Sequence, residues 1–87
     1  LTEQMGEITF AIARQRFERA VVVSDAAVLR AMKFAFFNLK IVLEPSGAAS
    51  LAALLQGGVD VGGATVAIIA SGGNVDAETF ARALEIQ

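Results

Sequence analysis

The sequence predicts an α/β fold: an incomplete piece of a parallel-sheet domain in which helices flank one long buried strand. Short apolar, β-branched runs alternate along the chain with stretches of helical periodicity, which is typical of this class. The run over 65–70 is apolar without alternation, as expected for a strand buried on both faces of a parallel sheet. With 87 residues the chain supplies too few strands to pair that one, so we expect the sheet to be incomplete.

The first half of the chain predicts a helix, a strand and a second helix. Apolar and charged residues fall on different faces over 6–17, which indicates a short amphipathic helix. The β-branched run 20–23 favours a short strand. The pair Ser24-Asp25 then offers an N-cap for a helix over 26–39. The apolar residues of this helix form more than one stripe, so we expect it to be covered on two sides.

The second half predicts a strand, a helix, a strand and a last helix. We expect the run 41–43 to be extended. The neighbouring Glu44 agrees with this, because the residue before a proline, here Pro45, is disfavoured in a helix. A helix over 46–55, rich in small residues that permit close approach, is stopped by the glycines that follow it. After a loop and the strand at 65–70, Asp76 can cap a helix over 77–85.

Composition excludes several classes of protein. An apolar fraction of 55% argues against disorder, and no apolar run reaches the roughly 18 residues that span a bilayer. A net charge of −2 argues against a nucleic-acid partner. Because the chain has neither Cys nor His, it has no disulfide, no thiolate nucleophile and no Ser-His pair. We expect a cytoplasmic protein without a membrane association.

So apolar a composition is unusual for so short a chain. Either the protein hides its surface in a partner or it is a piece of something larger. Its first residue, Leu1 rather than Met, hints at the second.

Two segments could carry chemistry. The segment Ser71-Gly72-Gly73-Asn74 follows a predicted strand and precedes a helix, where ligands of open α/β sheets bind, and its glycines allow close approach of a flat or anionic group. The alternative is a tight turn with Asn74 in a left-handed conformation. Glu44 is either a partly buried, functional carboxylate or an exposed residue before a Pro-started helix.

The remaining charged residues give no candidate site. We interpret Lys33 and Lys40 as solvated surface lysines. Asp60 and Asp76 lie in a loop and at a cap without a third oxygen ligand nearby in the sequence, so no metal site is expected.

Taken in order, several motifs resemble those of a known family. They are Phe10-Ala11-Ile12, the run from Val21 to Val28, Glu44-Pro45-Ser46-Gly47-Ala48 and Ser71-Gly72-Gly73-Asn74-Val75-Asp76. This set is similar to the C-terminal part of threonine dehydratase and serine racemase-like enzymes, which depend on pyridoxal 5'-phosphate and have the tryptophan-synthase-β fold type. The resemblance covers nearly the whole chain and implies that residues 1–87 are the C-terminal segment, a partial domain, of the cofactor domain of such an enzyme.

The resemblance also implies a cofactor and a reaction. Ser71 would hydrogen-bond the pyridine nitrogen of pyridoxal 5'-phosphate, and Glu44 would lie close to the cofactor ring. The implied reaction is dehydration and deamination of a hydroxy amino acid of the threonine or serine type to a 2-oxo acid and ammonia. The family's Schiff-base Lys, phosphate-binding loop and metal ligands have no counterpart here, and neither Lys33 nor Lys40 matches the catalytic Lys motif. We therefore assign no catalytic residue and no metal ligand, and we expect the 87 residues alone to be inactive.

The expected partners are an amino acid substrate and either the rest of a parent enzyme or another copy of the chain, with a homo-oligomer as the assembly. Two alternatives stay open: a non-catalytic, self-associating interaction module, and a serine racemase-like activity in the parent enzyme. A small-molecule-binding regulatory domain is less favoured, because its alternating amphipathic strands are missing.

Overall fold

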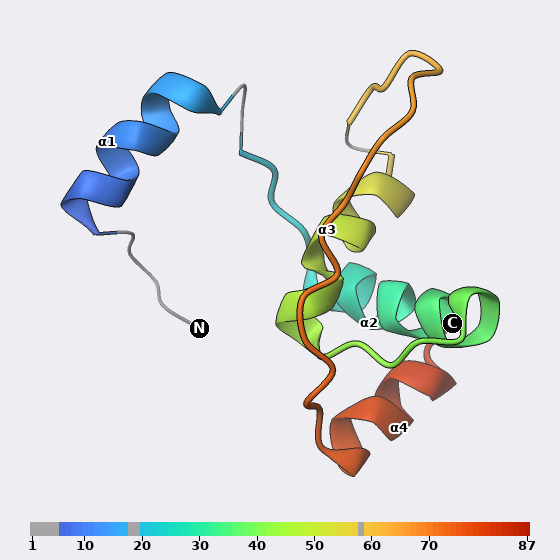
Figure 1. Cartoon of the computed structure of the whole chain (residues 1–87). Helices are drawn as coiled ribbons and strands as arrows, with labels where there is room; N and C mark the ends of the chain where they lie inside the picture. Colours follow the sequence, from blue (N-terminus) through green and yellow to red (C-terminus); the bar gives the residue numbers. More distant parts are fainter. Residues whose placement is uncertain (1–5, 18–19, 58) are drawn as a thin grey trace.

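A computed structural model of the chain describes residues 6–17, 20–57 and 59–87. These residues form four α-helices, α1 (Glu7–Arg16), α2 (Asp25–Phe34), α3 (Pro45–Leu55) and α4 (Ala77–Glu85), and one π-helical turn, η1 (Ala35–Leu39), that extends α2. The helices α2, α3 and α4 gather into one group, and α1 stands apart from them (Figure 1).

The predicted α/β fold is wrong, since the described residues contain helices and no strand. The runs 20–23, 41–43 and 65–70 are extended but carry no strand ladder. A β-strand exists through hydrogen bonds to a neighbouring strand, and a high β-propensity records only a good fit to such a surface. None of the three runs has that neighbour within the described ranges.

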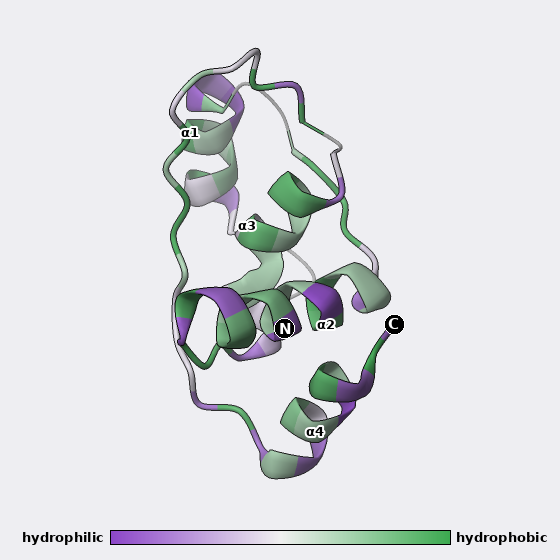
Figure 2. Ribbon diagram, turned by 90° about the vertical axis from the view of Figure 1, so that its right-hand side faces the viewer, coloured by the Kyte–Doolittle hydropathy of each residue, from purple (hydrophilic) through white to green (hydrophobic). Residues whose placement is uncertain are grey.

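The run 65–70 is also not buried. Ile69 is 78% exposed and Val66 is 42% exposed, and only Ile68 packs against the core. The segment passes alongside α3 at the outside of the molecule, where its apolar residues appear green in Figure 2. An apolar run without alternation therefore fails here as evidence for a doubly covered strand.

The four predicted helices are confirmed, and three of them, α2, α3 and α4, begin at the predicted signals. The hydroxyl oxygen of Ser24 accepts a hydrogen bond of 3.1 Å from the amide of Ala27, which caps α2. Asp76 caps α4 by accepting a 2.7 Å hydrogen bond from the amide of Thr79. Pro45 occupies the first position of α3, where its missing N–H costs no helical hydrogen bond.

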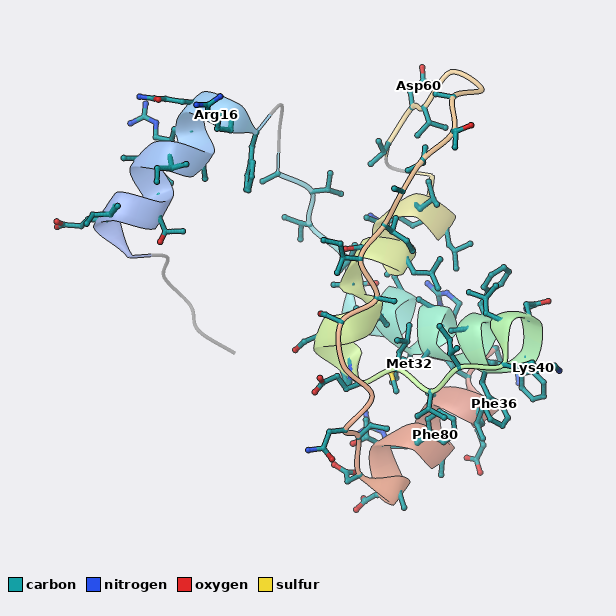
Figure 3. The ribbon with its side chains drawn as sticks, viewed as in Figure 1. Arg16, Met32, Phe36, Lys40, Asp60 and Phe80 are labelled. Atoms are coloured by element: carbon teal, nitrogen blue, oxygen red, sulfur yellow. The ribbon has the colours of Figure 1, made fainter. Side chains whose placement is uncertain are left out.

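The core forms where α2 packs between α3 and α4. Met32 is the largest fully buried side chain, and Figure 3 places it toward the middle of this helix group. The other buried hydrophobic residues are mostly alanines: Ala13, Ala27, Ala31, Ala35, Leu43, Ala48, Leu51, Ala52 and Ala83. Small side chains let helix backbones approach closely, as the composition of 46–55 predicted, but they bury little apolar area.

Two contacts attach α4 to α2 and η1. The rings of Phe36 and Phe80 meet edge to face, with their centroids 5.2 Å apart (Figure 3). The ammonium group of Lys33 donates a 2.8 Å hydrogen bond to the carbonyl of Ile86. The interpretation of Lys33 as a solvated surface residue is therefore wrong, because the side chain is half-buried and ties the end of α4 to α2.

The chain is more expanded than its length requires. Its Cα radius of gyration is 14.0 Å, whereas a compact domain of this length is expected at about 12 Å. Helix α1 accounts for part of the difference, since Ala13 is its one buried residue and Ile8 is 80% exposed. Within the described residues, no helix is long and apolar enough to cross a membrane.

The cap at Asp76 predicts a pH dependence for α4. Hydrogen bonds from the amide and side chain of Thr79 lower the pKa of this carboxyl group from its usual value. A lowered folded-state pKa contributes stability that is present above the unfolded value, near 3.9, and is lost as pH falls through the folded value. We expect helical circular dichroism to decrease on acidification below about pH 4.

The control is Asp76→Asn, which keeps a capping oxygen but does not titrate. In this variant the part of the acid transition that belongs to α4 is expected to disappear, while helicity at neutral pH is retained. An acid transition identical in the two proteins would contradict the assignment to Asp76.

Candidate functional site

The structure brings the two predicted site segments together at the start of α3. The backbone amide of Glu44, the residue before Pro45, donates a 3.2 Å hydrogen bond to the carbonyl of Gly72. The segment that contains Ser71 thus crosses the N-terminal end of α3, and Figure 1 shows the extended chain passing in front of that helix end. Two motifs that are far apart in the sequence form one junction.

Glycines make this junction possible. A side chain at Gly47 would collide with the carbonyl oxygen of Ser71 and would lie 2.7 Å from that of Gly72. A side chain at Gly73 would place its Cβ 2.5 Å from the carbonyl oxygen of Val42. The two consecutive glycines do permit close approach, but here the chain's own oxygens approach them: the Glu44 carboxylate at Gly72 and the Val42 carbonyl at Gly73.

The turn after Ser71 depends on Gly72. Its φ of 86° lies in the left-handed region, where a residue without Cβ is strongly favoured. The prediction of a left-handed Asn74 is wrong, because Lys40 is the one residue other than glycine with positive φ in the described part of the chain. Gly72 makes the turn instead, and Ser71 immediately precedes it.

The two predicted cofactor-binding side chains differ in exposure. Ser71 is an exposed residue. Glu44 is half-buried, which agrees with the interpretation of a partly buried carboxylate. Although Glu44 occupies the N-cap position of α3, its side chain accepts no hydrogen bond from the first turn of that helix. The roles of Ser71 and Glu44 toward a cofactor stay predictions.

The remaining charged candidates lie away from the junction. Lys40 is exposed at the end of η1 and donates a 2.9 Å hydrogen bond to the carbonyl of Phe37. Asp60 accepts a 2.9 Å hydrogen bond from the amide of Gly62 in the loop after α3. Nowhere in the described ranges do three or more His, Cys, Asp or Glu side chains gather as a metal site.

Three hollows of the described surface lie elsewhere. One of about 300 Å³ opens between α2 and α3, a second of about 320 Å³ lies beside η1 and the last residues, and a third of about 210 Å³ lies between the starts of α2 and α3 and helix α4. Neither Glu44 nor Ser71 lines any of these three hollows. These three hollows therefore do not enclose the junction.

The sequence reasoning did not identify the role of Gly47. A glycine inside a helix costs about 1 kcal/mol relative to alanine. A glycine in the first turn of α3 therefore indicates that another group packs where a side chain would lie. That signal was available in the sequence. The sequence does not show that this group is the backbone at Ser71.

Comparison with known proteins gives consistent relatives. The sequence profile described as "Pyridoxal-phosphate dependent enzyme" matches residues 2–72. An L-threo-3-hydroxyaspartate ammonia-lyase from a Pseudomonas species is 39% identical over 84 residues, which are 97% of this chain and 26% of that protein. A serine racemase from Schizosaccharomyces pombe is 36% identical over 83 residues, 95% of this chain and 26% of that protein. An L-threonine ammonia-lyase from Thermotoga maritima is 35% identical over 77 residues, 88% of this chain and 19% of that protein.

The chain spans about a quarter of the length of two ammonia-lyases and a serine racemase that it matches. No solved structure gives a significant match. The profile ends at residue 72, within the junction, whereas the alignment with the Pseudomonas protein takes in nearly the whole chain.

Proposed function

The chain belongs to the family of pyridoxal-phosphate dependent enzymes, and on this premise we propose that it forms part of the cofactor site of a hydroxy amino acid ammonia-lyase. The substrate would be of the threonine or serine type, and the products would be a 2-oxo acid and ammonia. The names of the relatives support this class of reaction, since two of the three compared proteins are ammonia-lyases that act on hydroxy amino acids. The third is a serine racemase, so racemisation by the parent enzyme is the second candidate.

One observation carries the proposal. The segment that contains Glu44 and the segment that contains Ser71 lie against each other, joined by the hydrogen bond from the Glu44 amide to the Gly72 carbonyl. Because these are the two segments for which a cofactor contact is predicted, their junction is where a cofactor ring would be held. Residues 1–87 would then be a C-terminal, partial segment of the cofactor domain.

The residues at the junction fit one part of pyridoxal phosphate. The hydroxyl group of the exposed residue Ser71 is a hydrogen-bond donor that a pyridine nitrogen can accept. Gly72 and Gly73 carry no side chains beside it, and the places of their Cβ atoms are taken by the Glu44 carboxylate and the Val42 carbonyl. This chain thus offers a hydrogen bond to the pyridine nitrogen. We assign none of its residues to phosphate binding or to the amine that reacts with the cofactor.

The cofactor, when bound, supplies the electron sink that such reactions require. The part of Ser71 is to bind and orient, because a neutral hydroxyl donates one hydrogen bond to the ring nitrogen without adding a charge. A carboxylate at this position would favour a protonated ring, and a hydroxyl does not. Glu44 would lie beside the same ring edge, and no proton transfer is assigned to it.

The first prediction is that this chain alone does not turn over substrate. Incubated with pyridoxal phosphate and L-threonine, it is expected to release no 2-oxobutanoate above the rate of the free cofactor, because no residue here is assigned as the reacting amine. The measurement is a coupled assay for the 2-oxo acid. Appreciable release would refute the proposal that the reacting amine comes from a part of the enzyme outside this chain.

The second prediction concerns Ser71. In the enzyme that carries this segment, Ser71→Ala is expected to shift the near-ultraviolet and visible absorbance of the bound cofactor and to lower activity about tenfold or more, equivalent to a hydrogen bond worth about 1.4 kcal/mol or more. The matched control is Ser50→Ala, an exposed serine of α3. An unchanged spectrum and activity in Ser71→Ala would rule out the contact.

A non-catalytic, self-associating module is the alternative function, and the exposed apolar surface favours it. The described residues leave many large apolar side chains exposed: Ile8, Phe10, Ile12, Phe17, Val21, Val22, Phe34, Phe37, Leu39, Ile41, Val42, Leu55, Val66 and Ile69. Large apolar side chains exposed in this number are typical of a chain whose surface is covered by a partner. A second copy of the chain or the remainder of a parent enzyme would cover it.

We expect the 87-residue chain to elute from size-exclusion chromatography at a mass above 9.1 kDa, with the shift growing at higher protein concentration. Burial of apolar side chains between copies would drive this association. A matched variant is Phe37→Ser, which removes one exposed ring of η1 while leaving the core residues unchanged. A monomer at all concentrations would argue against self-association.

A further inference from the structure

We propose that Glu44 is a positioning residue, whose carboxylate occupies the space that Gly72 leaves open and thereby holds the turn that presents Ser71. The consequence for a cofactor rests on the proposed function. The contact itself is a property of this chain and is tested without any cofactor.

The geometry at Gly72 points to this role. A Cβ at Gly72 would collide with Oε1 of Glu44 and would lie 3.1 Å from its Cδ and 3.6 Å from its Cγ. All three nearest atoms therefore belong to one side chain. The Glu44 carboxylate lies against the bare Cα of Gly72, in the place of the side chain that Gly72 does not have.

The backbone of Glu44 holds the carboxylate in this place. Its carbonyl accepts a 3.0 Å hydrogen bond from the amide of Ala48, and its amide donates to the carbonyl of Gly72. Pro45 follows directly and restricts the conformation of Glu44 to the extended region, where its φ of −77° and ψ of 163° lie. The side chain thus extends from the fixed end of α3 toward the turn.

The carboxylate gives up an alternative to make this contact. A short acidic side chain at an N-cap position can accept a hydrogen bond from the first turn of its helix, as that of Asp76 does for α4. Glu44 does not cap α3 in this way. Its side chain lies on Gly72 instead, so Ser71 is confined between Gly47 on one side and the turn held by Glu44 on the other.

A comparison with Gly63 distinguishes the two reasons why position 72 needs a glycine, namely its positive φ and its contact with Glu44. Both residues have a left-handed backbone, with φ of 80° at Gly63 and 86° at Gly72, so an alanine is strained at either position. Nothing lies within 4 Å of a Cβ at Gly63, whereas the Glu44 side chain fills that space at Gly72. The difference between the two alanine variants therefore isolates the contact with Glu44.

The experiment is a double-mutant cycle of Glu44→Ala and Gly72→Ala in the 87-residue chain, with Gly63→Ala as the matched control. The main measurement is the hydrogen-exchange rate of the amide at position 44, which donates to Gly72. We expect Gly72→Ala to raise this rate at least tenfold and Gly63→Ala to leave it within twofold. In the Glu44→Ala background, which removes the colliding atoms, adding Gly72→Ala should raise the rate by less than threefold.

Glu44→Gln provides a second variant that keeps the fold, because its amide fills the same volume as the carboxylate. Exchange at position 44 and at the amides of 71–73 is expected to stay within twofold of the unaltered chain in Glu44→Gln and to rise severalfold in Glu44→Ala. The proposal is overturned if Gly72→Ala and Gly63→Ala have equal effects on position 44, if the cycle shows no coupling, or if Glu44→Gln loosens the turn as much as Glu44→Ala.

These readouts are independent of the proposed function. A chain in which the cycle shows the expected coupling, but in which Ser71→Ala leaves the cofactor spectrum of the parent enzyme unchanged, would support the positioning role and refute the cofactor contact. The reverse combination would refute the positioning role alone.

Discussion

The close approach of backbones through small residues is the constraint on which the structure depends. Helix α2 packs against α3 through alanines that are almost fully buried, among them Ala31, Ala48 and Ala52. A larger side chain at any of these positions would separate the helices, because an interior at native density has no spare volume. Because Glu44 is the N-cap residue of α3, the α2–α3 contact also determines the position of Glu44 in the predicted site.

The same constraint acts at the junction of the two motifs, with glycine in place of alanine. Gly47, Gly72 and Gly73 each lie against oxygen atoms from the other segment, so three separate positions depend on the absence of a side chain. One hydrogen bond, from the Glu44 amide to the Gly72 carbonyl, gives the contact its direction. The steric fit at the three glycines allows the two segments to pack in this one arrangement. A short segment without regular secondary structure is in this way held in a defined place beside a helix.

The helices could be predicted from the sequence because their signals are local. Ser24 and Asp76 accept hydrogen bonds from amides three residues away, and Pro45 acts within its own residue. The strands could not, because a strand is a relation between segments, and the run 65–70 lacks a partner among the described residues. The same reason limited the prediction of the site. Both motifs were found, but the collision of a Gly47 side chain with Ser71 depends on where α3 lies, which spacing along the chain does not determine.

The apolar fraction of 55% has a different meaning once the core is known. Seven of the ten buried hydrophobic residues are alanines, whereas Phe, Ile, Leu and Val make up the exposed set. Burying an alanine removes little apolar area from water, so this core contributes much less free energy than the same number of leucines or phenylalanines. The larger part of the hydrophobic driving force available to the sequence thus lies unused on its surface. Covering this surface would add apolar burial of large side chains that the core does not contain, and an association that reached the junction at Glu44 and Gly72 would shield it from water.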